Sequence, residues 1–273
     1  MVLKTCFDLD AKANEQFGDI MIYDEKEIDN VDQHDPRRLL YLDRIRRVVS
    51  VVTSQFPDVT KSRIGELGCA QGNMSLLLGE LGYSVVALDI NHRFLEYSRL
   101  KHERGDIRWV VGDIDRPGMR NGIFDVVVLG EVIEHCAYPE DIIEKSLSHI
   151  RPGGMLILTT PNGSRIRTRL ATFRDALSRY DREYLERRQF GPDGKDHLFL
   201  FTLDEIGDIV PGNAEIVDIG YSGSTILINK YSAPMLRLVP VGFVEWTIRA
   251  LAKIPVLNRK TYNSLYAVIR RAN

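Results

Sequence analysis

The sequence predicts an α/β fold in which a mostly parallel sheet carries helices on both faces. Short apolar runs rich in Val, Ile and Leu alternate with segments whose apolar residues recur at helical spacing. One run, 63–67, leads directly into the small-residue turn 68–72 and then into a helical pattern over 73–81. A strand, a glycine turn and a helix in this order are typical of a nucleotide-type site, because the turn lets a ligand approach the backbone and the helix start offers free N–H groups.

Composition sets broad limits on function. The chain has 273 residues, of which 44% are apolar and 27% charged, and its formal charge of −2 gives no overall preference for nucleic acid or membrane. Its three cysteines show no CxxC spacing, which argues against a disulfide framework or a zinc cluster. The first residues lack the pattern of a signal peptide, and no apolar run approaches the ~20 residues of a membrane span. We therefore expect a cytoplasmic protein.

The order of elements predicts one domain over 1–273. Its expected parts are an N-terminal helical cover over 1–50 and helical insertions at 164–195 and 234–258. The sequence predicts strands at 63–67, 84–89, 107–111, 123–129, 155–160, 214–220 and 265–271, helices at 36–50, 73–81, 92–103, 139–149 and 202–210, and a turn over 151–154.

Acidic residues follow the first three predicted strands at spacings that suit an adenosine ligand. Asp89 comes 21 residues after Gly68, where its carboxylate can accept hydrogen bonds from ribose hydroxyls. Asp113, in the loop after the third strand, suits the adenine amino group. Glu66 is expected to orient the turn or to meet a ligand's ammonium group. The G-x-x-x-G spacing of the turn argues against a dinucleotide fingerprint, which needs G-x-G-x-x-G.

A second constellation combines two carboxylates with imidazoles. Glu131, Glu134 and His135 follow the strand 123–129 with i, i+3, i+4 spacing, and His197 precedes the helix 202–210. If Glu134 and His135 start a helix, their side chains can converge with that of Glu131. Such a set suits a divalent cation such as Mg²⁺, Mn²⁺, Fe²⁺ or Zn²⁺. Two alternatives stay open: His135 acts alone as a general base, or the group is structural.

These motifs together resemble the class I S-adenosylmethionine-dependent methyltransferases. ELGCAQG is similar to their glycine-rich first motif, LDI to the second, GDI to the adenine motif and FDVVVLGEVIEH to the fourth, while RPGG followed by LILTTPN matches the region of the fifth strand. The resemblance implies a Rossmann-like sheet of seven strands with an antiparallel last strand, and S-adenosylmethionine as cofactor. The cofactor-binding residues that we predict are Arg38, Glu66, Gly68, Cys69, Gly72, Asp89, Ile90, Asp113, Ile114 and Gly130.

Within that class the chain looks most like the ubiquinone-biosynthesis O-methyltransferases. HDPRRLLYLDRI is similar to their NPLRL-x-YI segment, whose arginine holds the cofactor's carboxylate and corresponds to Arg38. Asp35 and Arg37 depart from the family pattern, as does the insertion at 234–258. These departures leave the expected cofactor unchanged but put the substrate in doubt.

EVIEH followed by DHLFLFT is also similar to the small-RNA 3′-end 2′-O-methyltransferases. In that family, four residues hold a metal that engages two vicinal ribose hydroxyls. The resemblance implies that these residues correspond here to Glu131, Glu134, His135 and His197. Catechols and sugar diols share this vicinal-oxygen geometry. We expect an O-methyltransferase that acts on a catechol-like or vicinal diol hydroxyl of a small or lipid-linked molecule.

Other functions stay as alternatives. The basic segment 163–195 would suit methylation of an RNA 3′ end, but no aromatic-interleaved basic groove is recognisable, so nucleic acid is disfavoured as a partner. A catalytically silent cofactor-binding protein would not need an intact EVIEH. The segment 234–258 is apolar, basic and contains Trp246, so it predicts peripheral membrane contact at the inner membrane face or, alternatively, a cover for the substrate crevice or a homodimer contact.

Overall fold

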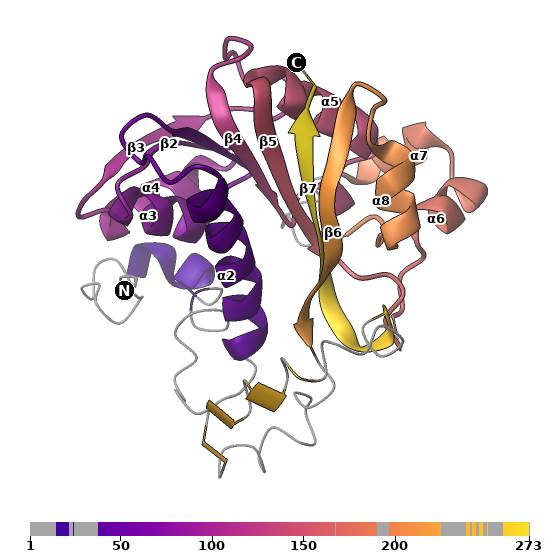
Figure 1. Cartoon of the computed structure of the whole chain (residues 1–273). Coiled ribbons are helices and arrows are strands. Elements are labelled where there is room, and N and C mark those ends of the chain that lie inside the picture. The colour runs from indigo at the N-terminus through magenta and orange to yellow at the C-terminus, as the bar shows by residue number, and fades with distance from the viewer. Residues whose placement is uncertain are drawn as a thin grey trace.

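A seven-stranded sheet forms the centre of the structure, a computed structural model (Figure 1). It describes residues 15–21, 24, 38–166, 168–189, 197–224, 239–240, 242–243, 246–247, 250 and 259–272. The strands are β1 Arg63–Leu67, β2 Ser84–Asp89, β3 Asp106–Val111, β4 Phe124–Gly130, β5 Ile150–Pro161, β6 Ala214–Ser224 and β7 Tyr262–Arg271. The helices are α2 Arg38–Gln55, α3 Asn73–Glu80, α4 His92–Lys101, α5 Pro139–His149, α6 Phe173–Arg179, α7 Arg182–Arg188 and α8 Leu203–Ile209, with a short 3₁₀ turn, η2, at Ile133–His135.

The strand order is β3-β2-β1-β4-β5-β7-β6, so the predicted mostly parallel seven-stranded sheet is confirmed. β7 runs antiparallel to both β5 and β6, as the antiparallel last strand requires. The chain builds outward from β1 to β2 and β3, and then returns to place β4 on the other side of β1. In an open α/β sheet this reversal opens a ligand crevice at the carboxyl ends of the strands.

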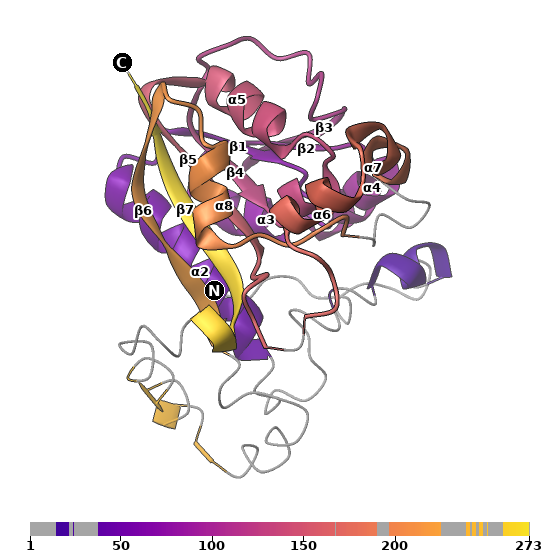
Figure 2. The ribbon, with the colours of Figure 1, turned by 90° about the vertical axis from the view of Figure 1, so that its right-hand side faces the viewer.

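Both faces of the sheet are apolar and both are covered (Figure 2). Successive side chains of a strand point to opposite faces. In β4, Val126 and Val128 accordingly pack into the core under α2, α3 and α4, whereas Val127 and Leu129 pack into the core under α5 to α8. A central strand buried on both sides reads as a continuous apolar run, which is why its position was predictable from sequence.

The predicted turn over 151–154 is wrong. These residues form the beginning of β5, which pairs with β4 through an irregular register between Phe124 and Val126. Between the pairs Phe124–Ile150 and Val126–Met155, residues 151–154 of β5 lie opposite the single residue Asp125 of β4. The glycine pair therefore lies in an irregular excursion within the strand, where Gly153 takes a positive φ of 76°.

Some predictions fall outside the described residues. The N-terminal cover over 1–50 is described only in part, and most of 234–258 is not described, so both stay predictions. Within 164–195 the described residues include the helices α6 and α7. In the part of the chain that the structure describes, no helix combines the length and the apolar character needed to cross a membrane.

Candidate functional site

The glycine-rich turn joins β1 to α3 in a left-handed backbone conformation. Gly68 and Gly72 have φ of 78° and 68°, and even Ala70 lies at 43°. A Cβ on Gly68 would come within 2.7 Å of a Val132 methyl, and one on Gly72 within 2.5 Å of the Trp109 ring. Both glycines are thus required by their backbone conformation and by the close packing of the turn against Val132 and Trp109.

Asp89, the last residue of β2, fastens this turn. Its Oδ2 accepts a hydrogen bond from the Ala70 amide at 2.7 Å, and its Oδ1 accepts one from the Asn91 amide at 2.8 Å. Burial raises the pKa of the Asp89 carboxyl. Each carboxylate oxygen has more than one lone pair, so these bonds leave acceptor capacity for a ligand hydroxyl.

The other predicted cofactor residues end neighbouring strands at the same edge of the sheet. Ile90 follows β2 and is exposed, whereas Ile114, in the loop after β3, is buried. Asp113 is exposed and its Oδ1 accepts a hydrogen bond from the Asp115 amide at 2.8 Å. Gly130 ends β4. Cys69 is buried within the turn, and the side chain of Arg38 lies outside what the structure describes.

Glu66 lies beneath the turn as a buried acid. The Ser75 hydroxyl of α3 donates a hydrogen bond to its carboxylate. Burial raises the pKa of the Glu66 carboxyl to about 7, with the negative charge of Asp89 adding to the effect. Glu66 therefore holds a proton near neutral pH and can release it to meet a positively charged ligand group.

Glu131 is not among the residues whose possible ligand atoms lie within 4.8 Å of one another. It follows β4 with a φ of 57°, and its amide donates to the Thr159 carbonyl at 2.9 Å. Its Oε2 pairs with Nη1 of Arg44 on α2 at 3.2 Å. Among the described residues no hydrogen-bond donor reaches its buried Oε1. The four-residue convergence expected from EVIEH and His197 is therefore not what these residues form.

Glu134, His135 and His197 do come together. One possible ligand atom from each lies within 4.8 Å of the others. The amide of Leu198 donates to the Glu134 carbonyl at 2.9 Å, and this bond brings the segment with His197 beside η2. The His135 and His197 rings lie 4.7 Å apart between centroids, in an edge-to-face arrangement.

The Glu134 carboxylate is completely buried. Thr160 donates a hydrogen bond to its Oε2 at 2.9 Å, while Oε1 accepts none from the described residues and lies 3.9 Å from Nε2 of His197. Burial, reinforced by the charge of Glu131, raises the pKa of the Glu134 carboxyl well above its usual range. An ionised carboxylate here needs a positive partner, such as a protonated histidine or a bound cation.

Sequence reasoning missed two of these participants. Arg44 sits within the predicted helix 36–50 without any local signal, because its role depends on how α2 packs against the sheet. Thr160 belongs to the apolar strand β5 and reads as one more β-branched strand residue.

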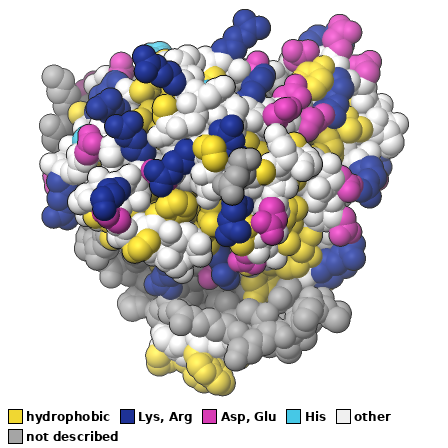
Figure 3. All heavy atoms as spheres, turned by 45° about the horizontal axis from the view of Figure 1, so that its top comes forward, with side chains coloured by type: hydrophobic (Ala, Val, Ile, Leu, Met, Phe, Trp, Pro, Cys, Tyr) yellow, Lys and Arg dark blue, Asp and Glu magenta, His cyan; other side chains and the backbone are white. Residues whose placement is uncertain are grey.

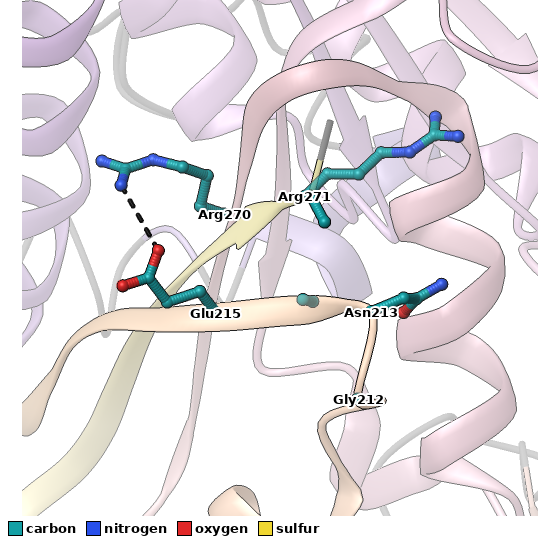
Figure 4. A pocket seen from close by; sticks show the side chains of 7 residues that line it. Gly212, Asn213, Glu215, Arg270 and Arg271 are labelled. Atoms are coloured by element: carbon teal, nitrogen blue, oxygen red, sulfur yellow. Dashed lines mark ion pairs between the residues drawn. The ribbon is translucent and has the colours of Figure 1, made fainter.

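A hollow at the opposite edge of the sheet is not this site. It borders the start of β6 and the end of β7, and its charged side chains are engaged: Glu215 pairs with Arg270 at 3.5 Å, and Arg271 donates to the Ser148 and Ile150 carbonyls (Figure 4). Seen from this side, acidic and basic side chains are both spread over the surface (Figure 3). The carboxyl ends of the parallel strands, with the glycine turn and the Glu134 cluster, lie at the other edge.

Residues 65–158, which contain the glycine turn, Asp89 and the Glu134–His135 pair, match the family described as a methyltransferase domain. Together with the strand order and the relatives that follow, this match supports a class I S-adenosylmethionine-dependent methyltransferase domain.

The particular relatives are modestly similar. The ubiquinone biosynthesis O-methyltransferase of Rickettsia canadensis is 29% identical over 121 residues, which are 44% of this chain and 51% of the relative. A probable S-adenosylmethionine-dependent methyltransferase of Mycolicibacterium smegmatis is 30% identical over 97 residues, or 36% of this chain and 37% of the relative. The chain thus spans about half the length, or less, of these curated relatives.

Solved structures show the same fold. An S-adenosylmethionine-dependent methyltransferase from Mesorhizobium loti aligns with a TM-score of 0.53 at 17% identity, covering 81% of this chain and 96% of that one. The [4+2]-cyclase SpnF aligns with a TM-score of 0.54 at 12% identity, covering 83% and 80%. Because a cyclase shares the fold, the reaction has to be argued from the site.

Proposed function

We propose that the protein transfers the methyl group of S-adenosylmethionine to a hydroxyl of a catechol-like or vicinal diol, carried by a small or lipid-linked molecule. The observation that carries this proposal is the cluster of Glu134, His135 and His197, which closely follows Val132, the residue packed against Gly68 of the glycine-rich turn. It offers groups that bind and deprotonate a hydroxyl at the edge of the sheet where the methyl donor is expected. The ubiquinone O-methyltransferase relatives support the choice of an oxygen acceptor.

In this proposal the turn and the strand ends hold the cofactor. Asp89 accepts hydrogen bonds from the ribose hydroxyls, and Asp113 accepts one from the adenine amino group. The peptide groups of the turn lie along the ligand. Glu66 and Arg38 provide opposite charges for the ammonium and carboxylate of the methionine part. These assignments rest on the positions of the residues at one sheet edge and on the acceptor capacity of Asp89.

A divalent metal fits the cluster. One carboxylate and two imidazoles form a donor set that such ions accept, and the buried Oε1 of Glu134 lacks a hydrogen bond from the described residues. Glu134, His135 and His197 would hold the ion, whereas Glu131 lies outside this set and pairs with Arg44 through Oε2. A bound ion lowers the pKa of a coordinated hydroxyl. The alternative without metal assigns proton removal to His135 alone.

In the alternative without metal, the acceptor hydroxyl loses its proton to an imidazole nitrogen of His135. In either case its oxygen attacks the methyl carbon of the sulfonium. The C–O bond forms as the C–S bond breaks, and the electron pair of that bond returns to sulfur, which becomes a neutral thioether. Glu134 stabilises the positive charge that His135 or His197 acquires. Alignment of oxygen, methyl and sulfur supplies the rest of the rate enhancement.

Methylation of an RNA 3′ end is less well supported than a small diol. Three arginines of the basic segment are paired with carboxylates: Arg174 with Asp208, Arg182 with Glu140 and Arg187 with Glu183. Paired guanidinium groups do not form the free cationic track that phosphates need.

An acceptor panel tests the proposal. The protein with radiolabelled S-adenosylmethionine would be offered catechols, glycan diols, single-hydroxyl analogues of each, and RNA with a free 3′ diol or a 3′ phosphate. We expect methylation of a diol and at least tenfold less of its single-hydroxyl analogue. Transfer to an amine or thiol only, or equal transfer to diols and single hydroxyls, would contradict the proposal, and transfer to RNA only would favour the alternative.

A further inference from the structure

A fully buried charged group lies behind the glycine-rich turn, outside the site described above. Lys101, the last residue of α4, has no exposed side-chain surface, and Asp24 of the N-terminal part is 1% exposed. The Lys101 ammonium donates to Oδ2 of Asp24 at 2.7 Å and lies 4.6 Å from the centroid of the Tyr97 ring. An ion pair removed from water is retained at a large desolvation cost, so its presence calls for an explanation.

Asn73 connects this ion pair to the cofactor turn. Its amide nitrogen donates to Oδ1 of Asp24 at 2.8 Å, and its carbonyl oxygen accepts from Lys101 at 2.6 Å. Tyr97 completes the network by donating to Oδ2 of Asp24 at 2.8 Å. Asn73 is the first residue of α3 and directly follows Gly72, yet only 4% of its surface is exposed. Its side chain is therefore committed to the network.

The turn is thus held at both ends. On the strand side, the Leu88 carbonyl accepts from the amides of Gly68 and Cys69, at 2.8 and 3.0 Å. On the helix side, the side chain of Asn73 is clamped between a buried cation and a buried anion. The helix side matters for a ligand because the free N–H groups of α3 begin there.

Asp24 belongs to an N-terminal segment, distant in sequence, that makes further contacts with α4. Helical residues 15–21 lie beside α4 in both ribbon views (Figures 1 and 2). Arg93 pairs with Asp19 at 2.8 Å on the surface, and the rings of Phe17 and Tyr97 approach to 5.9 Å. Phe17, Ile20 and Met21 are buried in this contact.

We propose that Asp24, Lys101 and Asn73 form a positioning device, through which the N-terminal segment fixes the start of α3 and so shapes the turn that receives the cofactor. None of the three is a catalytic residue. Docking of the segment and binding of S-adenosylmethionine are coupled through Asn73. The proposal depends on the cofactor site and not on the acceptor proposed above.

The test compares two variants of the device with one outer anchor in the full-length protein. Asp24→Asn removes the anion, and Asn73→Ala cuts the link to α3 while leaving the Asp24–Lys101 pair in place. Asp19→Asn is the matched control, because it weakens the same segment's attachment at an exposed ion pair. Calorimetric titration with S-adenosylhomocysteine gives the affinity, and thermal unfolding gives the stability of each variant.

We expect both device variants to bind S-adenosylhomocysteine at least tenfold more weakly, and Asp19→Asn to bind within twofold of the wild type. Amide hydrogen exchange at 69–73 should be faster in the device variants. If Asp24→Asn does not fold, Asn73→Ala carries the test alone.

Wild-type affinity in Asn73→Ala, with only the melting temperature lowered, would overturn the proposal and leave the network a purely structural one. If the wild type does not bind S-adenosylhomocysteine, the cofactor assignment fails instead, and exchange at 69–73 then decides the proposal: unchanged exchange overturns it.

Discussion

Arg44 of α2 and Glu131 at the end of β4 form an ion pair, 3.2 Å between Nη1 and Oε2, in which both side chains are about four-fifths buried, with 20% and 21% exposed. The Arg44 charge also lowers the carboxyl pKa of Glu66 and Glu134, against the larger effect of burial. The positive charge of one guanidinium therefore stabilises the ionised forms of three carboxyl groups at the carboxyl ends of the strands. This makes α2 an electrostatic part of the site as well as a cover for the core.

Arg44→Met should lower the free energy of unfolding by about 1–3 kcal/mol, because it leaves a largely buried carboxylate without its cation. Combination with Glu131→Gln in a double-mutant cycle should show a coupling of about 1 kcal/mol or more. Urea unfolding provides the values. Arg108→Met, at an exposed position of β3, is the control and should change stability by less than about 0.5 kcal/mol. Additive effects of the two site substitutions would show that the pair contributes nothing.

The fold and the cofactor turn were predictable because their signals are local. β4 is apolar on both faces, and the turn needs glycine at 68 and 72. A few consecutive residues are therefore enough to locate the strand and the turn. The same holds for Asp89, which ends the apolar strand β2 and accepts a hydrogen bond from the turn that follows the neighbouring strand β1.

The arrangement of the acidic cluster was not predictable, because it depends on packing between distant segments. The spacing of Glu131, Glu134 and His135 allows convergence, but Glu131 has a positive φ and turns to Arg44. His197 reaches the cluster through a hydrogen bond between its neighbour Leu198 and the Glu134 backbone. No periodicity in the sequence encodes either contact.

Asp89→Ala should weaken the binding of S-adenosylmethionine and its demethylated product by roughly 1.5–3 kcal/mol, the range for hydrogen bonds to a charged group. The loss combines the missing ribose contact with a loosened Ala70 amide. Titration calorimetry measures it. Asp106→Ala, at the other end of the adjacent strand β3, should leave the affinity unchanged, since Asp106 accepts its bond from Ser84. Wild-type affinity in Asp89→Ala would remove Asp89 from the site.

Metal use is tested by direct binding as well as by activity. The protein should bind Mn²⁺, and Glu134→Gln and His197→Ala should each abolish that binding, because an incomplete ligand set holds a labile ion poorly. His92→Ala, an exposed position at the start of α4, is the control. A chelator should stop turnover without changing cofactor affinity. Full activity in excess chelator would establish His135 as a base without metal.

Glu131→Gln separates two forms of the metal site. If Glu131 leaves Arg44 to become a fourth ligand, the variant should lose Mn²⁺ affinity at least tenfold. If the three-residue cluster is sufficient, Mn²⁺ affinity should stay within twofold of the wild type and only stability should change.

Stability should fall as pH rises toward neutrality because of Glu66. Its carboxyl pKa is raised to about 7 in the folded protein, whereas an unfolded glutamate titrates near 4.3. Between these values the folded protein keeps a proton that the unfolded chain has released, so the contribution is fully present below about pH 4 and is lost by about pH 7. Glu66→Gln should therefore gain roughly 3 kcal/mol relative to the wild type between pH 4.5 and pH 8. Urea unfolding without cofactor tests this, and a pH-independent difference between the two proteins would contradict it.

Phe243 and Trp246 present exposed aromatic surface that we expect to contact a membrane. Their side chains are 59% and 64% exposed, and their ring centroids lie 5.9 Å apart. The surrounding sequence supplies Arg237, Arg249 and Lys253, so an aromatic anchor would be combined with attraction to anionic lipid. Such contact would bring the site to a lipid-linked acceptor.

The protein should co-sediment with phosphatidylserine-containing vesicles at low salt, and binding should weaken with added salt and fall at least fivefold in a Phe243→Ala, Trp246→Ala double variant. Tyr180→Ala, which removes an exposed aromatic from α6–α7, should bind as the wild type does. If the wild type stays in the supernatant at low salt, membrane contact is excluded, and sedimentation velocity of the double variant then tests whether these rings form a homodimer contact.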